Sequence, residues 1–518
     1  MNMNSQLRYK VFIPPFLILI TAVLASLLNL ESFLTVTTAI NGWILDTFGW
    51  LFSAGAFFMV VTCVVVFFSP LGKVTIGGNN AKPLLNKWRW GSITICTTTA
   101  AGMLFWATAE PLLHLYSPPK SLDITPGSRE AAEFSLSTMY MHWSFTPFVL
   151  YAVPALSFAL AFYNLSQRFS ISASLQPLFG RRCSQSVGGI VDSISMFALV
   201  AGMASSLGTG ALVLSSGISN ITGLLDGAFL LGIVIALIMV SFVASSVSGL
   251  HKGIARLSAL NTVIFALIAL IAFIFGPTQT IVTNGAQALV DYTSEFVTRS
   301  FSLNLDPSDN WDKSWTVFYW ANWLAWAPIV ALFLGKIAKG HTVRAFIVVN
   351  MVIPATFSLV WMAIFSGMIL ELDLSQNGAF YAILNENGAG AVVYSLLEQL
   401  PASRVLIGMF IFIAFLAYVT AADSNTEAIS SLCLDKQGIS EESNPLKSKL
   451  KILWGSIIAL IAWFMTAFSG IDGIKMMSNL GGLPALFVVL AMNASLLIWV
   501  VKAISQALKQ YQARKQLT

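Results

Sequence analysis

Five tryptophans lie between residues 311 and 326, where the chain reads WDKSWTVFYWANWLAW. Trp320, Trp323 and Trp326 recur every three residues, which places them broadly along one side of a helix. Leucine would serve equally well for packing against lipid, so a row of indole rings at membrane depth indicates a ligand that prefers aromatic faces. Trp311 and Trp315 suit the water interface at the end of the same helix.

A second aromatic group, MHWSFTPFVLY at 141–151, holds Trp143, Phe148 and Tyr151, with Pro147 interrupting the helix. A quaternary ammonium carries positive charge but has no N–H to donate, so hydrogen-bonding side chains cannot recognise it. Aromatic faces can, and each ring contributes about 0.5–2 kcal/mol where water is excluded. The two groups together favour a binding site for such a cation. The alternative is that the rings only fill the core of a helix bundle.

Four carboxylates fall inside apolar segments, namely Glu110, Asp192, Asp423 and Glu427. A charge at membrane depth is costly, so each must be paired, hydrated, protonated or near a helix end. We expect a structural role for Asp192 and Glu427, and leave structural and functional roles open for the other two. His142 and His114 are more typical of hydrogen bonds between helices than of a proton relay.

A membrane-embedded enzyme that uses Glu110 with His142 or His114 is a hypothesis from another class. The sequence shows no spacing of a nucleophile and a base that is typical of an enzyme, and this hypothesis would leave the aromatic groups without a function. The four cysteines share no metal-binding spacing. We therefore expect no enzyme and no cofactor, apart from a possible coupling ion.

The elements that must position these residues are membrane spans. Of the 518 residues 56% are apolar and 10% charged, and the apolar residues fall in blocks long enough to cross roughly 30 Å of hydrocarbon. No cleavage site follows the first block, which we interpret as an uncleaved span. The sequence predicts about twelve spans, at 11–30, 48–69, 91–116, 137–165, 189–215, 227–249, 257–276, 315–335, 345–370, 404–428, 452–469 and 480–503.

The connections between these spans alternate between basic and acidic. Most of the 28 Lys and Arg residues lie in the tails and the even-numbered connections. Six lie in connections rich in Asp and Glu, namely Lys120, Arg129, Arg299, Lys313, Arg404 and Lys475. Basic residues near span ends stay in the cytoplasm, so both short tails, 1–10 and 504–518, are expected to be cytoplasmic in a bacterial-type inner membrane.

We expect one all-α transmembrane transporter domain. Residues 282–300 mix apolar and polar residues at helical spacing, which predicts a helix along the outer interface. This segment separates the spans of 91–276 from those of 315–503, a division that suits two five-span repeats of inverted topology. The first two spans, 11–69, are then peripheral.

Motifs spread over nearly the whole chain resemble the betaine/choline/carnitine transporter (BCCT) family. The segment FYWANWLAWAPIVALFLGKIAKGHTVRAFI (318–347) is similar to that family's signature of an aromatic run, a proline and a basic loop. Also similar are LFWATAEPLLHLYSPP (104–119), HWSFTPFVLYAVPALSFALAFY (142–163), HKGIARLSALN (251–261) and TAADS (420–424). Together these motifs are highly specific.

The resemblance implies a LeuT-like fold, a homotrimer in contact through the interfacial helix, and an aromatic box near the membrane midplane. Matched residue by residue, the box consists of Trp143, Phe148, Tyr151 and Trp323, with Trp326 close by and Trp315 at a second, waiting site.

Two positions of this site depart from the family pattern. Phe148 stands where members usually carry Trp, and Asn322 replaces one Trp of the run, where it could contact a substrate carboxylate or hydroxyl. Span three keeps one glycine, Gly102, of a stretch that is glycine-rich in betaine and choline carriers and glycine-poor in carnitine/butyrobetaine exchangers. We expect the backbone to unwind near Ala101 to Met103 and to meet a substrate carboxylate.

The resemblance also locates candidates for ion coupling. In TAADS the serine that usually follows Thr420 in sodium-coupled members is Ala421, which weakens a sodium site because a hard cation needs several oxygens. The exchangers use an arginine in span seven, where this chain has Ala255 followed by Arg256. The candidates are Thr99, Thr420, Ser205, Ser206 and Arg256.

The primary hypothesis is alternating-access transport of a small quaternary-ammonium compound, namely glycine betaine, carnitine or butyrobetaine, or choline. Coupling stays open between sodium, protons and exchange, with sodium-independent exchange or weakly ion-coupled uptake favoured. The alternatives are a carrier of another zwitterion, such as a sulfonium compound or a modified amino acid, and an osmotic sensor, which the short basic tail at 503–518 disfavours. Besides its substrate we expect the lipid bilayer as a partner, and no nucleic acid.

Overall fold

The computed structural model describes the backbone of residues 7–98, 100–248, 251–301, 303, 305–434 and 445–515. Regular structure in these residues is helical, apart from two isolated β-bridges that join Leu7 to Leu434 and Thr75 to Thr342. The all-α fold predicted from the sequence is confirmed.

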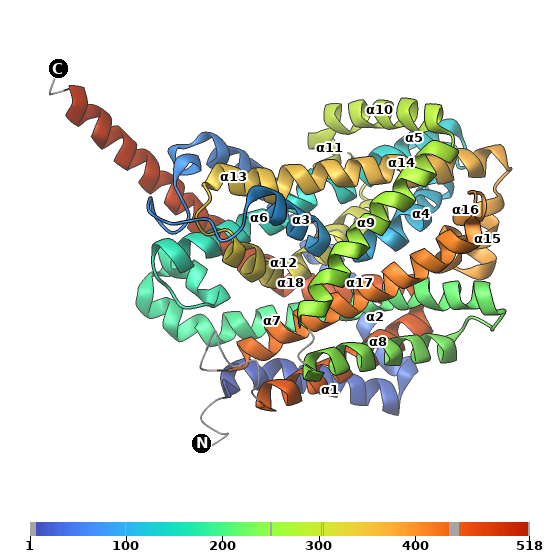
Figure 1. The fold of residues 1–518 in the computed structure, drawn as a ribbon, viewed down its shortest axis with the longest axis horizontal. Coiled ribbons are helices and arrows are strands. Elements are labelled where there is room, and N and C mark those ends of the chain that lie inside the picture. Colours follow the sequence, from blue (N-terminus) through green and yellow to red (C-terminus); the bar gives the residue numbers. More distant parts are fainter. Residues whose placement is uncertain are drawn as a thin grey trace.

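The helices form one bundle (Figure 1). The first half of the chain contains α1 (Tyr9–Leu28), α2 (Leu30–Phe68), α3 (Lys87–Thr98), α4 (Ala100–Tyr116), α5 (Arg129–Trp143), α6 (Phe145–Ala159), α7 (Gln176–Thr222), α8 (Ala228–Ser248) and α9 (His251–Phe275). The second half contains α10 (Thr278–Ser294), α11 (Phe296–Ser300), α12 (Phe318–Ile337), α13 (Val343–Ile347), α14 (Ile353–Ser375), α15 (Ala379–Asn387), α16 (Ala389–Glu398), α17 (Ser403–Leu432) and α18 (Pro445–Lys515).

These helices make the chain a multi-pass membrane protein. In the described part of the chain, eight helical segments are long and apolar enough to cross a membrane, or nine if the bent pair α9–α10 is one span. Predicted span three covers α3 and α4, span four covers α5 and α6, and α18 holds the last two predicted spans. The number twelve stays a prediction, because several spans are built from more than one helix.

The interruption of span four has a cause in the sequence. α5 ends at Trp143 and α6 begins at Phe145, on either side of Ser144 with φ −115° and ψ −120°. A proline in a helix clashes with the carbonyl four residues earlier, which for Pro147 is that of Trp143. The predicted interruption is therefore present, three residues before the proline itself.

The bend in α18 lies at Gly470, directly after the predicted end of the span 452–469. Gly470 has φ 53° and ψ −132°, outside the helical range, and a positive φ favours glycine because it has no Cβ. The sequence analysis placed Lys475 in a connection between the last two spans. Helical structure resumes beyond Gly470, so Lys475 lies on a helix, where it is partly buried, and its place between the two spans stays a prediction.

α12 is a central helix of the bundle. It packs against α6, α7 and α18. In the most apolar stretch of the segment Lys313–Ile337, 83% of the residues are buried, against 28% in that of α1. α1 therefore lies at the edge of the bundle, while the tryptophans of α12 lie inside it.

Residues 282–300 are helical, in α10 and α11. α10 turns by 106° from α9 and runs along the outside of the bundle (Figure 1). It leaves Val282, Leu289 and Val290 exposed. This helix thus presents apolar side chains away from the rest of the chain.

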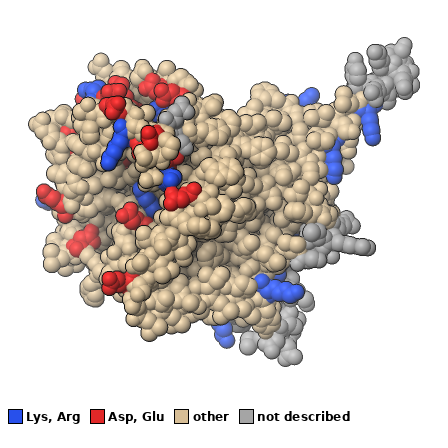
Figure 2. Space-filling view, turned by 180° about the vertical axis from the view of Figure 1, so that it is seen from behind, with Lys and Arg blue, Asp and Glu red and all other residues tan. Residues whose placement is uncertain are grey.

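Charge is segregated between the two ends of the molecule. Figure 2 shows most acidic side chains of this face at one end, which is the end that holds α15 and α16 in Figure 1. At the opposite end, where α18 finishes, the described charges on this face are those of Lys and Arg. The segregation matches the alternation of basic and acidic connections along the sequence.

Candidate functional site

Trp323 of α12 lies among three aromatic side chains from α5 and α6. Its ring centroid is 5.6 Å from that of Trp143, 5.6 Å from that of Phe148 and 5.0 Å from that of Tyr151, with angles of 61° to 75° between the ring planes. All four side chains are at most 5% exposed. Rings at these distances and angles pack edge to face, so the four side chains form one aromatic cluster. We call these four residues the box.

A hydrogen bond and the close approach of α4 position the rings of the box. Nε1 of Trp323 donates to the carbonyl of His142 at 3.2 Å, in the last turn of α5, where carbonyls lack partners within their own helix. On the other side, a Cβ added to Gly102 would lie 2.9 Å from Cη2 of Trp143. Gly102 therefore allows α4 to approach the indole ring.

The expected unwinding at residues 101–103 is not found. Residues 101–103 are helical and belong to α4, while residue 99 lies outside the described residues. Met103 packs toward α14, where Oγ of Ser358 donates to its sulfur at 3.6 Å. The side chain of Ala101 is not among those described.

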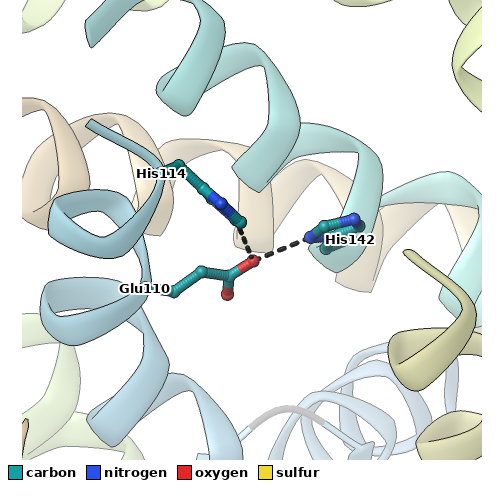
Figure 3. A group of neighbouring side chains, drawn as sticks. All are labelled: Glu110, His114 and His142. Carbon is teal, nitrogen blue, oxygen red and sulfur yellow. Dashed lines mark hydrogen bonds and ion pairs between the residues drawn. The ribbon is translucent and has the colours of Figure 1, made fainter. Parts of the chain in front are cut away.

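The carboxylate of Glu110 is fully buried beside the box (Figure 3). Its Oε1 accepts hydrogen bonds from Nε2 of His114 at 3.1 Å and Nδ1 of His142 at 2.7 Å. Its Oε2 accepts from Nε1 of Trp143 at 3.0 Å and from the hydroxyl of Tyr319. Four donors on two oxygens fit an ionised carboxylate, whose charge they stabilise.

Glu110, His114 and His142 could also hold a metal ion, since one ligand atom from each lies within 4.8 Å of the others. Two imidazoles and a carboxylate suit zinc and related divalent ions. The same atoms already bond to one another, and Nε2 of His142 pairs with Thr316 at 3.1 Å. These contacts join α4 and α5 to the segment just before α12.

The sequence suggested a link between Glu110 and either histidine only in the enzyme hypothesis, and it gave no indication of Tyr319. The spacing of Glu110 and His114, four residues apart on one helix face, was the available signal. The approach of His142 and Tyr319 depends on how three helices pack, which linear spacing does not reveal.

Two predicted residues of α12 face other neighbours. Trp326 lines a pocket that Ser206 of α7 also lines. Asn322 accepts a hydrogen bond from Ser478 at 3.0 Å, and Ser478 shares another with Ser205 at 2.8 Å. Asn322 therefore joins α12 to α18 and α7. The row of tryptophans at three-residue spacing does not serve one ligand site.

The candidates for ion coupling are described in part. Thr420 on α17 donates to a carbonyl of its own helix at 3.0 Å. Ser206 and Ala421 line the same pocket. Thr99 and the side chain of Arg256 lie outside the described residues.

The remaining carboxylates inside spans are paired. Asp192 forms an ion pair with Arg8 at 2.7 Å, which ties α7 to the start of α1. Lys451 of α18 pairs with Asp423 at 3.4 Å and with Glu427 at 2.6 Å, both on α17. These contacts join helices and support structural roles for all three acids.

Trp315 lies outside the box. Its ring centroid is 4.5 Å from that of His114, and Nζ of Lys475 lies 3.4 Å from the same indole centroid. Nothing in the sequence indicated that Lys475 reaches an aromatic ring.

Comparisons with known proteins agree over nearly the full length. A sequence model of the betaine/carnitine/choline (BCCT) family of transporters matches residues 10–504. A probable glycine betaine transporter of Desulfitobacterium hafniense (strain Y51) is 30% identical over 90% of this chain and 92% of its own. The ectoine/hydroxyectoine transporter of Virgibacillus pantothenticus is 29% identical over 86% and 87% of the two chains. The osmo-independent choline transporter BetT1 of Acinetobacter baylyi (strain ATCC 33305 / BD413 / ADP1) is 29% identical over 84% and 82%.

Proposed function

The chain belongs to the betaine/carnitine/choline transporter family, and from this premise we propose that it carries a small quaternary-ammonium compound across a bacterial-type inner membrane. It is a membrane transporter rather than an enzyme. The observation that carries the choice of substrate is the convergence of Trp143, Phe148, Tyr151 and Trp323, which come from two distant segments and are buried together.

In this proposal the ammonium group lies between the rings of the box. We expect a substrate carboxylate to face α4, because Gly102 allows this helix to approach the indole ring of Trp143. Phe148 is a weaker cation–π partner than Trp. A betaine, whose carboxylate adds a second contact, should therefore bind more tightly than choline.

We propose that two repeats of inverted topology, 91–276 and 315–503, rock about the box. Support comes from the origin of the box residues, because Trp143 and Tyr151 belong to the first segment and Trp323 to the second. Exchange or weakly ion-coupled uptake is the expected coupling, since Ala421 supplies no hydroxyl beside Thr420.

Uptake into proteoliposomes tests the proposal. Purified protein is given labelled glycine betaine, carnitine or choline, with and without a sodium gradient and with and without unlabelled substrate inside. We expect uptake of a quaternary amine that internal substrate accelerates more than sodium does. If no quaternary amine moves under any condition, the proposed role of the box is wrong.

A second candidate substrate is a zwitterion whose cation is not a quaternary ammonium. Similarity to the ectoine/hydroxyectoine transporter supports it. Aromatic faces also attract a flat, delocalised cation, so the same box suits such a compound. Unlabelled ectoine that inhibits betaine uptake more strongly than unlabelled betaine would favour this candidate.

We further propose that both tails are cytoplasmic and that the protein is a homotrimer in contact through α10. The segregation of charge supports the orientation (Figure 2). The exposed apolar side chains of α10, including Val282 and Val290, support a contact with another copy.

A further inference from the structure

The side chain of Lys475 is directed onto aromatic rings. Its Nζ lies 3.4 Å from the ring centroid of Trp315 and 5.5 Å from that of Phe318. These rings are 8% and 1% exposed, so the ammonium group meets ring faces that are shielded from solvent. Within the part of the chain that the structure describes, Lys475 forms no ion pair.

An ammonium group ordinarily directs its three N–H donors at water or carboxylates. Here the ammonium group also lies on two ring faces, whose attraction depends on positive charge rather than on N–H groups. A quaternary ammonium has that charge and needs no hydrogen-bond acceptor, so it suits the same rings. Trp315 and Phe318 therefore form a ring site for a cation, and the chain's own amine occupies it.

The ring site is connected to the box by a series of aromatic contacts. Trp315 lies 6.2 Å from Trp106, Trp106 lies 5.9 Å from Tyr319, and Tyr319 lies 5.4 Å from Trp143 of the box, all between ring centroids. A cation that leaves the ring site thus meets further rings on the way to Trp143. Since like charges repel, Lys475 also disfavours a second cation nearby.

We propose that Lys475 is an internal competitor for the transported cation: its ammonium group holds the ring site of Trp315 and Phe318 until a quaternary ammonium displaces it. The inference rests on the proposed function for the identity of that cation. Asp472, exposed and three residues earlier on the same helix, is placed to receive the displaced amine, because side chains three residues apart on a helix are neighbours.

Binding of tetramethylammonium, the smallest quaternary ammonium, to purified protein tests this inference by calorimetry. Lys475→Met removes the charge but keeps an apolar side chain of similar length. We expect it to tighten binding by about tenfold, the scale of one cation–π contact. Lys475→Arg, which keeps the charge, should bind as the wild type does. Lys475→Gln repeats the test if the Met variant does not fold.

Lys313→Met is the matched control, because Lys313 lies two residues from Trp315 but pairs with Asp46 at 2.8 Å instead of a ring. A second variant, Lys475→Met with Trp315→Leu, should lose the gain. The inference is overturned if Lys475→Met binds no more tightly than Lys313→Met, or if the gain survives Trp315→Leu. Because tetramethylammonium binding is measured without transport, tighter binding together with absent betaine uptake would contradict the proposed function and leave the inference standing.

Discussion

The ring of Trp323 contacts the rings of the other three box residues, so its removal eliminates all three of these contacts. We expect Trp323→Leu to raise the KM for betaine uptake by about 10- to 30-fold, the equivalent of one strong cation–π contact. Trp50→Leu is the control, because Trp50 is 68% exposed on α2 and distant in sequence from the box. Equal effects of both changes would show that the box does not bind the substrate.

Glu110 is expected to be ionised because both of its oxygens accept two hydrogen bonds. Glu110→Gln leaves one acceptor oxygen and points N–H groups at buried donors. We expect it to lower the free energy of unfolding by about 1–3 kcal/mol, measured as a lower apparent melting temperature in detergent. Glu386→Gln, at an exposed position of α15, should change it by less than about 0.5 kcal/mol. An unchanged melting temperature for Glu110→Gln would indicate a protonated carboxyl group.

The aromatic residues show which parts of the site could be predicted from the sequence and which could not. Trp143, Phe148, Tyr151 and Trp323 were predicted by resemblance, and they do lie together. The expectation of one tryptophan face failed because each three-residue step falls about 60° short of a full helical turn. Over two steps, Trp326 turns about 120° away from Trp320, far enough to face another pocket.

Gly470 is the residue that determines the shape of α18, the longest helix. A Cβ there would meet nothing within 4 Å, so the cost of Gly470→Ala is conformational alone. We expect a loss of about 1–3 kcal/mol of stability from the positive φ, measured by thermal unfolding in detergent. Gly408→Ala on α17 also has open space but an ordinary φ, and should be neutral or stabilising by up to about 1 kcal/mol. Equal melting temperatures for the two variants would contradict this account.

Helix interruptions were predictable only where chemistry forbids a helix. The break in span four could be predicted from Pro147, because the proline ring clashes with the carbonyl of Trp143 in a regular helix. Glycine tolerates both helical and other conformations, so Gly470 does not reveal from sequence whether the chain bends or simply ends a helix there. The helical conformation around Lys475 could not be predicted for this reason.

The two ends of the molecule differ in charge, which gives the whole protein an expected orientation. In a chain whose four cysteines are replaced by Ala, Ser308→Cys should react with a membrane-impermeant maleimide in right-side-out vesicles. Ser505→Cys should react only after permeabilisation. Both positions are exposed on the protein surface, so labelling depends on which side of the membrane each position faces. The reverse pattern of labelling would show that the tails face outward.

The exposed apolar face of α10 gives the whole protein an expected oligomeric state. With Val290→Cys, a bifunctional maleimide should produce trimers on a denaturing gel, because Val290 is 59% exposed on that face. Val360→Cys on α14, 55% exposed, should stay monomeric under the same conditions. Trimers from both variants, or from neither, would remove α10 as the contact.

The bond from the Trp323 indole to the His142 carbonyl fixes a wall of the box to the main chain of a different helix. If α12 swings away from α5, this bond breaks early, and Trp323 then leaves the other three rings. If the box binds the substrate as we propose, the substrate then loses the ring of Trp323 as the two helices separate. Release of the substrate would thus be coupled to the movement that opens its path.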